Sequence, residues 1–195
     1  DELPLCRAAA QGDAEALAAL LAEPGAEVNT CRNTRSGHLP LHYAAIARSN
    51  GARCTELLLG ARADVAETTN EGAQALHLAA ENACGGEEVL ALLLAARADA
   101  DAKTTGSRSA LHFAAIEGVF STARVLLEAR ADVNIMNSCG AIPLHWAAKT
   151  GKRDLCELLI EARSDLTVVD NLGRTPYGMA EDNLQEQVLD LLRGG

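Results

Sequence analysis

Aromatic residues are scarce in this sequence, because Phe, Tyr and Trp together make up only 3% of its 195 residues. A β-sandwich core needs many Val, Ile, Thr and aromatic side chains, so this composition argues against such a fold. Ala and Leu dominate instead, which favours helices that pack closely through small side chains. The length suffices for one domain or for a linear array of small units.

Long apolar runs and an excess of positive charge are also missing. The longest apolar run, residues 89–96, is far too short to cross a bilayer, so we expect no direct membrane insertion. The chain opens with Asp1 and Glu2, without the basic and then apolar segments of a secretory leader. The formal net charge is −10. Phosphate backbones repel an acidic chain, so we predict no nucleic-acid partner.

Closely spaced cysteine pairs and catalytic motifs are absent as well. The six cysteines are Cys6, Cys31, Cys54, Cys84, Cys139 and Cys156. None has the spacing of a zinc site or redox motif, and a disulfide scaffold would be smaller and denser in cysteine. No nucleophile elbow, phosphate-binding glycine loop or His-Glu-x-x-His helix occurs. We therefore predict no enzyme, no cofactor and no metal site, and free thiols in a reducing intracellular compartment. That compartment would be the cytoplasm or nucleus, or an organelle if a targeting segment was removed.

A repeated phrase dominates the sequence. The pattern Leu-His-x-Ala-Ala occurs at residues 41–45, 76–80, 111–115 and 144–148. Degenerate copies lie at residues 5–9 and 175–180. The four histidines are 35, 35 and 33 residues apart. A fixed period of this length indicates an array of similar supersecondary units.

A second phrase follows each copy of the first at a similar distance. Ala-Arg-Ala-Asp or Ala-Arg-Ser-Asp occurs at residues 61–64, 96–99, 129–132 and 162–165, while the first unit has 24–29 in its place. Between the two phrases, Leu and Ala recur at steps of three and four residues, which predicts a helix with an apolar stripe. One short helix pair cannot bury its own stripe, so neighbouring units must cover it.

Together the two phrases resemble the ankyrin repeat family. The family pattern is a Thr-Pro-Leu-His-x-Ala-Ala helix start, a Leu-rich second helix, and Gly-Ala-Asp-Val-Asn leading into a β-turn finger. The resemblance covers residues 1–195 and implies an all-α ankyrin-repeat solenoid of helix-turn-helix pairs joined by fingers. We divide this single domain into six repeats, including degenerate N- and C-terminal caps: 1–33, 34–68, 69–103, 104–136, 137–169 and 170–195.

Proline and glycine place several details of the units. Pro40 and Pro143 are expected in the first turn of a short helix, where a missing N–H is harmless. The two extra residues of the 35-residue steps fall near 50–51 and 85–86, which predicts longer turns between the helices of units two and three. Ser107 stands where other units have a glycine, so we expect a differently shaped finger there.

The family resemblance also implies a role for the repeat histidines, and the sequence predicts how the last unit ends. In the family, this histidine hydrogen-bonds backbone near the turn and braces one unit on the next, which accounts for all four copies without metal or acid–base chemistry. The last unit is expected to end in an amphipathic helix from Leu184 to Leu192.

Arginine replaces the family's usual glycine in the second phrase, at Arg62, Arg97, Arg130 and Arg163. That residue ends the second helix and commonly adopts a left-handed conformation, which costs a non-glycine residue roughly 1–2 kcal/mol. Either the helix ends without that conformation or the arginine regains energy elsewhere. Stacked repeats would align these residues as a possible basic ridge for an acidic partner; the alternative is a tolerated substitution copied with the repeat.

The few aromatic residues are informative because three of them follow a repeat histidine: Tyr43, Phe113 and Trp146. The family resemblance places this position on the concave surface, so the three side chains either face a partner or pack between repeats. Phe120 begins a second helix, and we expect it to pack. The predicted protein-binding residues on fingers and short helices are Arg35, His38, Tyr43, Glu71, Arg108, Phe113, Cys139, Trp146, Lys149 and Arg174.

The leading functional interpretation is a non-catalytic adaptor or scaffold that binds another protein through the concave finger and short-helix surface. We expect a monomer unless the chain is part of a larger complex. The alternative is a stoichiometric structural subunit of a multi-protein assembly, for example an organellar membrane complex. Such a subunit would expose a large apolar patch. An inhibitor that blocks a partner's active site has the same sequence features as an adaptor.

Overall fold

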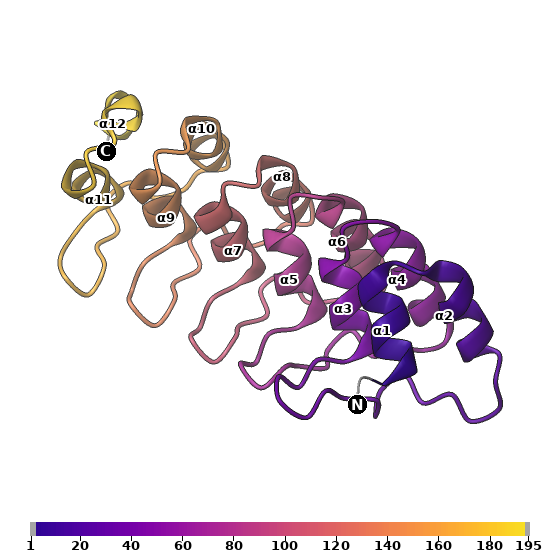
Figure 1. Ribbon diagram of the computed structural model, residues 1–195. Coiled ribbons are helices and arrows are strands. Elements are labelled where there is room, and N and C mark those ends of the chain that lie inside the picture. Colours follow the sequence, from indigo (N-terminus) through magenta and orange to yellow (C-terminus); the bar gives the residue numbers. More distant parts are fainter. Residues whose placement is uncertain (1–2, 194–195) are drawn as a thin grey trace.

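A computed structural model describes residues 3–193, and within that range the chain forms twelve helices in six antiparallel pairs. The pairs are α1 (Pro4–Gln11) with α2 (Ala14–Leu21), α3 (Pro40–Ile46) with α4 (Gly51–Gly60), α5 (Ala75–Glu81) with α6 (Gly86–Ala95), α7 (Ala110–Glu117) with α8 (Phe120–Glu128), α9 (Pro143–Lys149) with α10 (Arg153–Glu161), and α11 (Pro176–Asp182) with α12 (Glu186–Leu192). Figure 1 shows the pairs stacked side by side, with a long loop, or finger, projecting below each short helix from α3 onward. The predicted all-α solenoid is confirmed.

Two layers of helices run along the array. The first helices of successive pairs pack on one another from α1 to α11, and the second helices pack in a parallel layer from α2 to α12. Pro40 and Pro143 occupy the first position of α3 and α9, as predicted. The residue before each of these helices is extended, because proline disfavours a helical conformation in the preceding residue.

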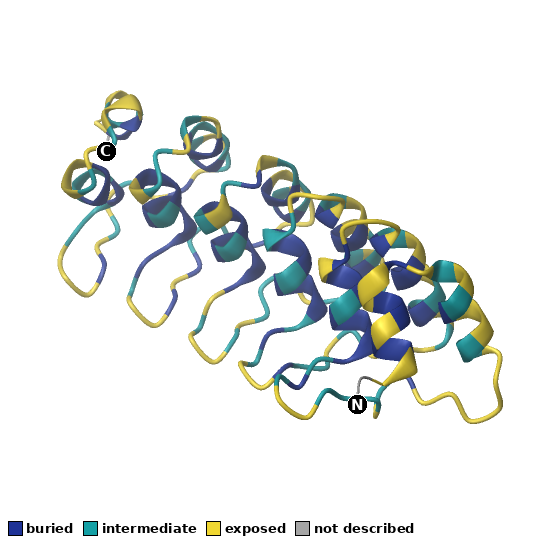
Figure 2. Ribbon diagram, viewed as in Figure 1, coloured by how far each residue is buried: buried dark blue, intermediate teal, exposed yellow. Residues whose placement is uncertain are grey.

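The core consists of alanine and leucine between the two layers, and Figure 2 shows these buried faces turned toward each other. The Ala-Ala pairs of α3, α5, α7 and α9 have no exposed surface, and neither have Leu58, Leu93, Leu126 and Leu159 of the second helices. Alanine lets neighbouring first helices approach closely, while leucine fills the space between layers. Each unit therefore buries its apolar stripe against its neighbours, as a solenoid requires.

The turns within the pairs confirm the sequence interpretation of the repeat length. Residues 47–50 join α3 to α4 and residues 82–85 join α5 to α6, whereas only residues 118–119 join α7 to α8. Asn50 and Gly85 take left-handed conformations just before the second helix. The two extra residues therefore lengthen the turn and leave the stacking intact.

Three local predictions are wrong. Ser107 adopts the left-handed φ of 56° itself and donates its N–H to the Thr104 carbonyl, just as Gly72 does to Thr69, so its finger keeps the common shape. The last helix begins at Glu186. Leu184 precedes that helix because it is the left-handed residue that closes α11, with the Gln185 N–H donating to the Ala180 carbonyl. Phe120 is 43% exposed, because it lies in the outer layer with one face toward solvent.

Four terminal residues, Asp1, Glu2, Gly194 and Gly195, lie outside the described range. The first and last of the six predicted repeats are therefore described only from residue 3 and up to residue 193.

Candidate protein-binding surface

The four repeat histidines are buried and bridge neighbouring units. His42, His77, His112 and His145 are at most 1% exposed. In each, Nδ1 accepts the backbone N–H three residues earlier, at 3.0–3.2 Å. That contact satisfies an N–H group that the first turn of a helix leaves without a partner. Because Nδ1 accepts, Nε2 carries the proton and donates it to a backbone carbonyl nearer the next unit, at 2.9–3.2 Å. The predicted bracing role is confirmed.

Burial also fixes the protonation state of these histidines. Desolvation lowers the pKa of His42 and of His112 to about 4, and it lowers the pKa of His77 and His145 as well. Backbone hydrogen bonds to the rings oppose this shift without overcoming it. The rings are therefore neutral at physiological pH and serve as structural braces.

The fingers are joined at their tips by a ladder of backbone hydrogen bonds. Asn70, Thr105, Ser138 and Asn171 each donate an N–H to the carbonyl of the preceding finger, at 2.9–3.3 Å. The first finger is wider than the others, since Asn33 donates to the His38 carbonyl five residues on while Thr69 reaches the Ala73 carbonyl four residues on. The fingertips thus form one connected surface whose first member has an extra residue.

In the first five units, the residue after the histidine position is exposed or half-buried and differs from unit to unit. The series is Arg7, Tyr43, Leu78, Phe113 and Trp146, between neighbouring residues that are mostly buried. The sequence prediction left open whether the aromatic members pack or face a partner; in the structure each is half-buried, so it packs on its neighbours and keeps part of its surface exposed. Arg7 was missed by the sequence interpretation, although the degenerate copy at residues 5–9 places it in this series.

Three of the predicted binding residues lie together, with Arg108 and Lys149 near the Trp146 ring. The Arg108 guanidinium carbon lies 5.6 Å from the centre of the Trp146 ring, and the Lys149 ammonium lies 5.1 Å from it. Arg108 comes from a finger, while Trp146 and Lys149 lie on α9. The indole Nε1 is buried and has no hydrogen-bond partner within residues 3–193. Two cations thus flank one aromatic ring, an arrangement that cation–π attraction stabilises.

Tyr43 and Phe113 have different surroundings. The Tyr43 ring centre lies 5.3 Å from that of His38, and its hydroxyl accepts a hydrogen bond from the Asn33 amide at 3.0 Å. Burial lowers the pKa of His38. Phe113 packs edge-to-face on the buried His77, at 5.7 Å between ring centres. Tyr43 therefore packs on the finger that leads into its own helix and Phe113 packs on the neighbouring unit, while both keep part of their surface exposed.

Acidic side chains occupy the middle of the array. Burial raises the pKa of Glu81 on α5, and the negative charges of Glu117 and Glu71 raise it further. Glu71 lies at a fingertip, Glu81 at the end of α5 and Glu117 at the end of α7. The surface therefore has an acidic centre between Arg7 at one end and the Arg108–Lys149 pair nearer the other.

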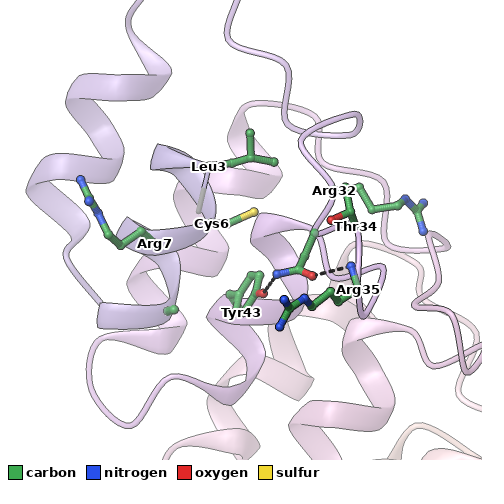
Figure 3. Close-up of a pocket in the computed structure, with 9 residues that line it drawn as sticks. Leu3, Cys6, Arg7, Arg32, Thr34, Arg35 and Tyr43 are labelled. Carbon is green, nitrogen blue, oxygen red and sulfur yellow. Dashed lines mark hydrogen bonds between the residues drawn. The ribbon is translucent and has the colours of Figure 1, made fainter. Parts of the chain in front are cut away.

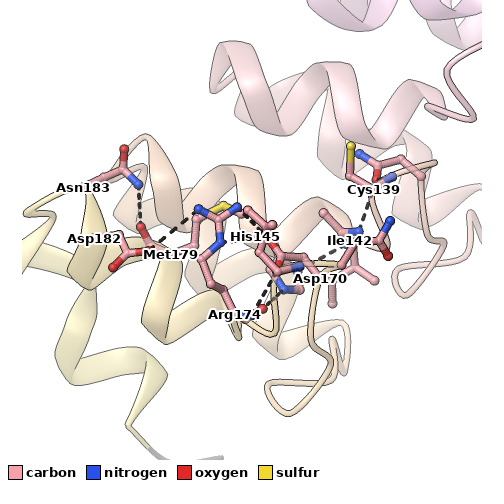
Figure 4. Close-up of polar contacts among 12 residues, drawn as sticks. Cys139, Ile142, His145, Asp170, Arg174, Met179, Asp182 and Asn183 are labelled. Atoms are coloured by element: carbon pink, nitrogen blue, oxygen red, sulfur yellow. Dashed lines mark hydrogen bonds and ion pairs between the residues drawn. The ribbon is translucent and has the colours of Figure 1, made fainter.

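Arg174 is tied to its own unit. Its guanidinium donates to the Asp170 carboxylate at 2.7 and 2.9 Å and lies 3.8 Å from Asp182 (Figure 4). The Asp170 side chain is only 3% exposed, so this pair closes the last finger on itself, and the contact with Asp182 connects the finger to α11. Cys139, by contrast, is an exposed fingertip thiol.

The four arginines of the second phrase all adopt the left-handed conformation, with φ between 64° and 68°. They are exposed, and within residues 3–193 their side chains make no hydrogen bond or ion pair. Each is followed two residues later by an exposed aspartate: Asp64, Asp99, Asp132 and Asp165. The Asn29 side chain accepts the Asp64 N–H and donates to the Arg62 carbonyl, which holds one of these loops. The row of positive charges therefore alternates with negative ones.

This architecture defines a helical-repeat solenoid with a continuous surface of fingers and short helices. The family model described as "Ankyrin repeats (3 copies)" matches the chain in overlapping segments, residues 5–105, 47–137, 83–170 and 111–194. The chain belongs to the ankyrin repeat family. Ankyrin repeats generally mediate protein–protein interaction, and proteins built from them are typically non-catalytic. A comparison with curated proteins found no match.

None of the helices within residues 3–193 has both the length and the apolar character needed to span a membrane. In the same range, no group of three or more His, Cys, Asp or Glu side chains is placed to hold a metal ion.

Proposed function

We propose that this chain is a non-catalytic adaptor or scaffold that binds another protein along the surface formed by the first helices and the fingers. The observation that carries this proposal is the half-buried Trp146, flanked by Arg108 and Lys149. Binding hot spots are enriched in Trp, Tyr and Arg, and these residue types recur along the same surface at Arg35, Tyr43 and Trp146. The proposed binding set also includes His38, Glu71, Phe113 and Cys139.

Rigidity supports the proposal. The fingertip ladder and the histidine bridges hold the surface in one conformation before a partner arrives. A preformed surface avoids much of the ordering cost of association. Arg174 contributes less directly, because its guanidinium is already paired with Asp170.

A matched pair of variants tests this proposal. Trp146→Leu places at this position the residue that unit three already has there, Leu78, so the fold should tolerate it. Phe120→Leu removes an exposed aromatic ring from the outer layer as the control. With each tagged protein incubated in an extract of its source, we expect Trp146→Leu to lower the yield of a specific retained protein about tenfold. Equal retention by both variants, or loss with Phe120→Leu alone, would overturn the proposal.

One observation favours a second candidate, a permanent subunit of a larger assembly such as an organellar membrane complex. Met136 and Val169, which precede two neighbouring fingers, are 48% and 51% exposed, and Leu172 at the last fingertip is 75% exposed. Contiguous exposed apolar surface marks interaction sites. The mass of the native particle separates the two candidates: migration near the 20.4 kDa of the chain supports a free adaptor, and fixed-stoichiometry migration with a large complex supports a subunit.

A further inference from the structure

A cavity of about 480 Å³ opens where the array begins, between α1, the first finger and α3 (Figure 3). Its polar lining comes from Arg7 on α1, from Arg32, Asn33, Thr34 and Arg35 on the finger, and from Tyr43 on α3. The finger here is the wide one with the extra residue. A cavity of this size can enclose a side chain or a small ligand.

The charge of this cavity is opposite to that of the whole chain. Three arginines and no acidic residue line it, although the chain carries a net charge of −10. Arg32 is not free to bind a ligand, because its guanidinium pairs with Glu67 and donates to the Thr68 carbonyl. The Arg7 and Arg35 guanidinium groups make no hydrogen bond or ion pair within residues 3–193. Two cations are therefore available to a ligand.

The neutral groups of the cavity also offer donors. The Asn33 side-chain oxygen accepts the N–H groups of Arg35 and Ser36, at 2.9 and 3.1 Å. The Asn33 amide nitrogen donates to the Tyr43 hydroxyl oxygen at 3.0 Å, which leaves the hydroxyl proton of Tyr43 without an acceptor in the described chain. A ligand in this cavity therefore meets positive charge and hydrogen-bond donors, while the side-chain amide acceptor is already occupied.

We propose that this cavity binds a carboxylate, an Asp or Glu side chain of the partner protein, through the exposed guanidinium groups of Arg7 and Arg35, which point in different directions in Figure 3 and would turn toward the ligand. The inference rests on the proposed function and adds the chemistry of one contact. Guanidinium and carboxylate form strong, charge-assisted hydrogen bonds, and the Tyr43 hydroxyl supplies a further donor. Leu3 and Ala10 form apolar wall against which the methylene groups of the ligand side chain pack.

The test is an NMR titration of the ¹⁵N-labelled protein with two capped peptides of equal length, one with two glutamates and one with glutamines in their place. We expect the glutamate peptide to shift the side-chain Nε signals of Arg7 and Arg35 and the amides of residues 33–35 in a saturable way. The glutamine peptide should not shift them. The double variant Arg7→Gln, Arg35→Gln should weaken binding of the glutamate peptide about tenfold or more.

The control removes the same charge from elsewhere on the molecule. The double variant Arg48→Gln, Arg193→Gln alters two exposed arginines outside the cavity that make no hydrogen bond or ion pair within residues 3–193, and it should retain the affinity of the parent within about twofold if the attraction is local. Equal weakening by both double variants would overturn the inference, because it would indicate a general charge effect. Absence of saturable shifts, or equal binding of the glutamine peptide, would also overturn it.

A titration with inorganic phosphate tests whether the cavity binds a free phosphate ion and not a protein carboxylate. Tighter binding of inorganic phosphate than of the glutamate peptide at the same signals would overturn the carboxylate assignment. The Trp146→Leu experiment stays independent of these results. If partner retention still depends on Trp146 while the glutamate peptide fails to bind, the carboxylate site is wrong and the adaptor proposal stands.

Discussion

Two neighbouring positions on the first helices behave in opposite ways. The histidine position has the same residue in four successive units, and every copy is buried with both ring nitrogens bonded to backbone. The next position holds Arg7, Tyr43, Leu78, Phe113 and Trp146 in successive units, and these residues keep exposed surface. Backbone groups are the same in every unit, so a residue that binds them can repeat. A residue that faces outward meets no such constraint.

In a repeat protein, recognition residues are expected at positions that vary beside positions that repeat. Repetition marks the groups that hold units together, and variation beside it marks surface that is free to differ. The second-phrase arginines do not fit this division, because they repeat although they are exposed and unpaired.

The largest expected effect is a loss of stability in acid that comes from the histidine position. The folded pKa of His42 and of His112 is about 4, against about 6.5 in an unfolded chain. Between these values the unfolded state binds protons that the folded state does not, so the free energy of unfolding falls as the pH falls. Above about pH 6.5 the rings are mostly neutral in both states, so the stability that the histidines contribute no longer rises with pH. From pH 7 to pH 5 we expect a loss of roughly 2 kcal/mol for each of the two residues.

Urea denaturation followed by circular dichroism at several pH values measures this loss. The variant His112→Asn lacks one titrating ring, so its stability should change with pH by roughly 2 kcal/mol less than that of the parent over the same interval. An unchanged pH dependence in His112→Asn would show that other groups cause the acid sensitivity.

A smaller effect is expected from removing one histidine at neutral pH. His112→Ala leaves the Ser109 N–H and the Ala141 carbonyl without their partner, which should lower the free energy of unfolding by about 3 kcal/mol. The adjacent change Phe113→Leu copies the residue of unit three and should cost less than about 1.5 kcal/mol. Urea denaturation of the two variants compares the positions directly. If Phe113→Leu costs as much as His112→Ala, the distinction between bracing and variable positions fails.

The smallest expected effect is a gain of stability at the arginine position. Arg130 has a φ of 65°, and glycine there relieves strain while making the unfolded chain more flexible, so Arg130→Gly should stabilise by about 0.5–1 kcal/mol. The control Arg124→Gly lies within α8, where arginine pairs with Glu87 and Glu128. It should destabilise by about 1 kcal/mol.

Thermal and urea denaturation of both arginine variants decide what the repeated arginines contribute. A loss of stability in Arg130→Gly would mean that the arginine regains more energy than its backbone costs. That result would favour a structural reason for the repeat. A gain in stability combined with weaker partner retention would favour the basic ridge of Arg62, Arg97, Arg130 and Arg163 as part of the binding surface.

Much of the fold could be predicted from sequence because the repeat is strictly periodic. The histidine spacing placed the short helices, the prolines placed their first turns, and the extra two residues placed the longer turns. Ser107 and Leu184 were predicted wrongly for a shared reason. In both, hydrogen bonds around the residue hold a left-handed conformation, and the residue type alone indicates the opposite.

The candidate site was only partly predictable. Sequence position indicated Arg108, Trp146 and Lys149 separately, but their grouping around one ring depends on how a finger of one unit lies against the short helix of the next. The same applies to Arg174, whose pairing with Asp170 removes it from the free surface. The degenerate first copy of the phrase places Arg7 at the variable position, but only the structure shows that Arg7 lines a cavity.

The sequence by itself determined the repeating unit, the stacking and the buried histidines, because these follow from local periodicity and from contacts between identical backbone groups. Only the tertiary structure decided which charges remain free. Arg32 forms an ion pair with Glu67, and Arg174 forms one with Asp170. Arg7 and Arg35 line a cavity and remain unpaired within residues 3–193. Side chains of the same type differ here because pairing depends on distances between units, and those distances exist only after the units have stacked.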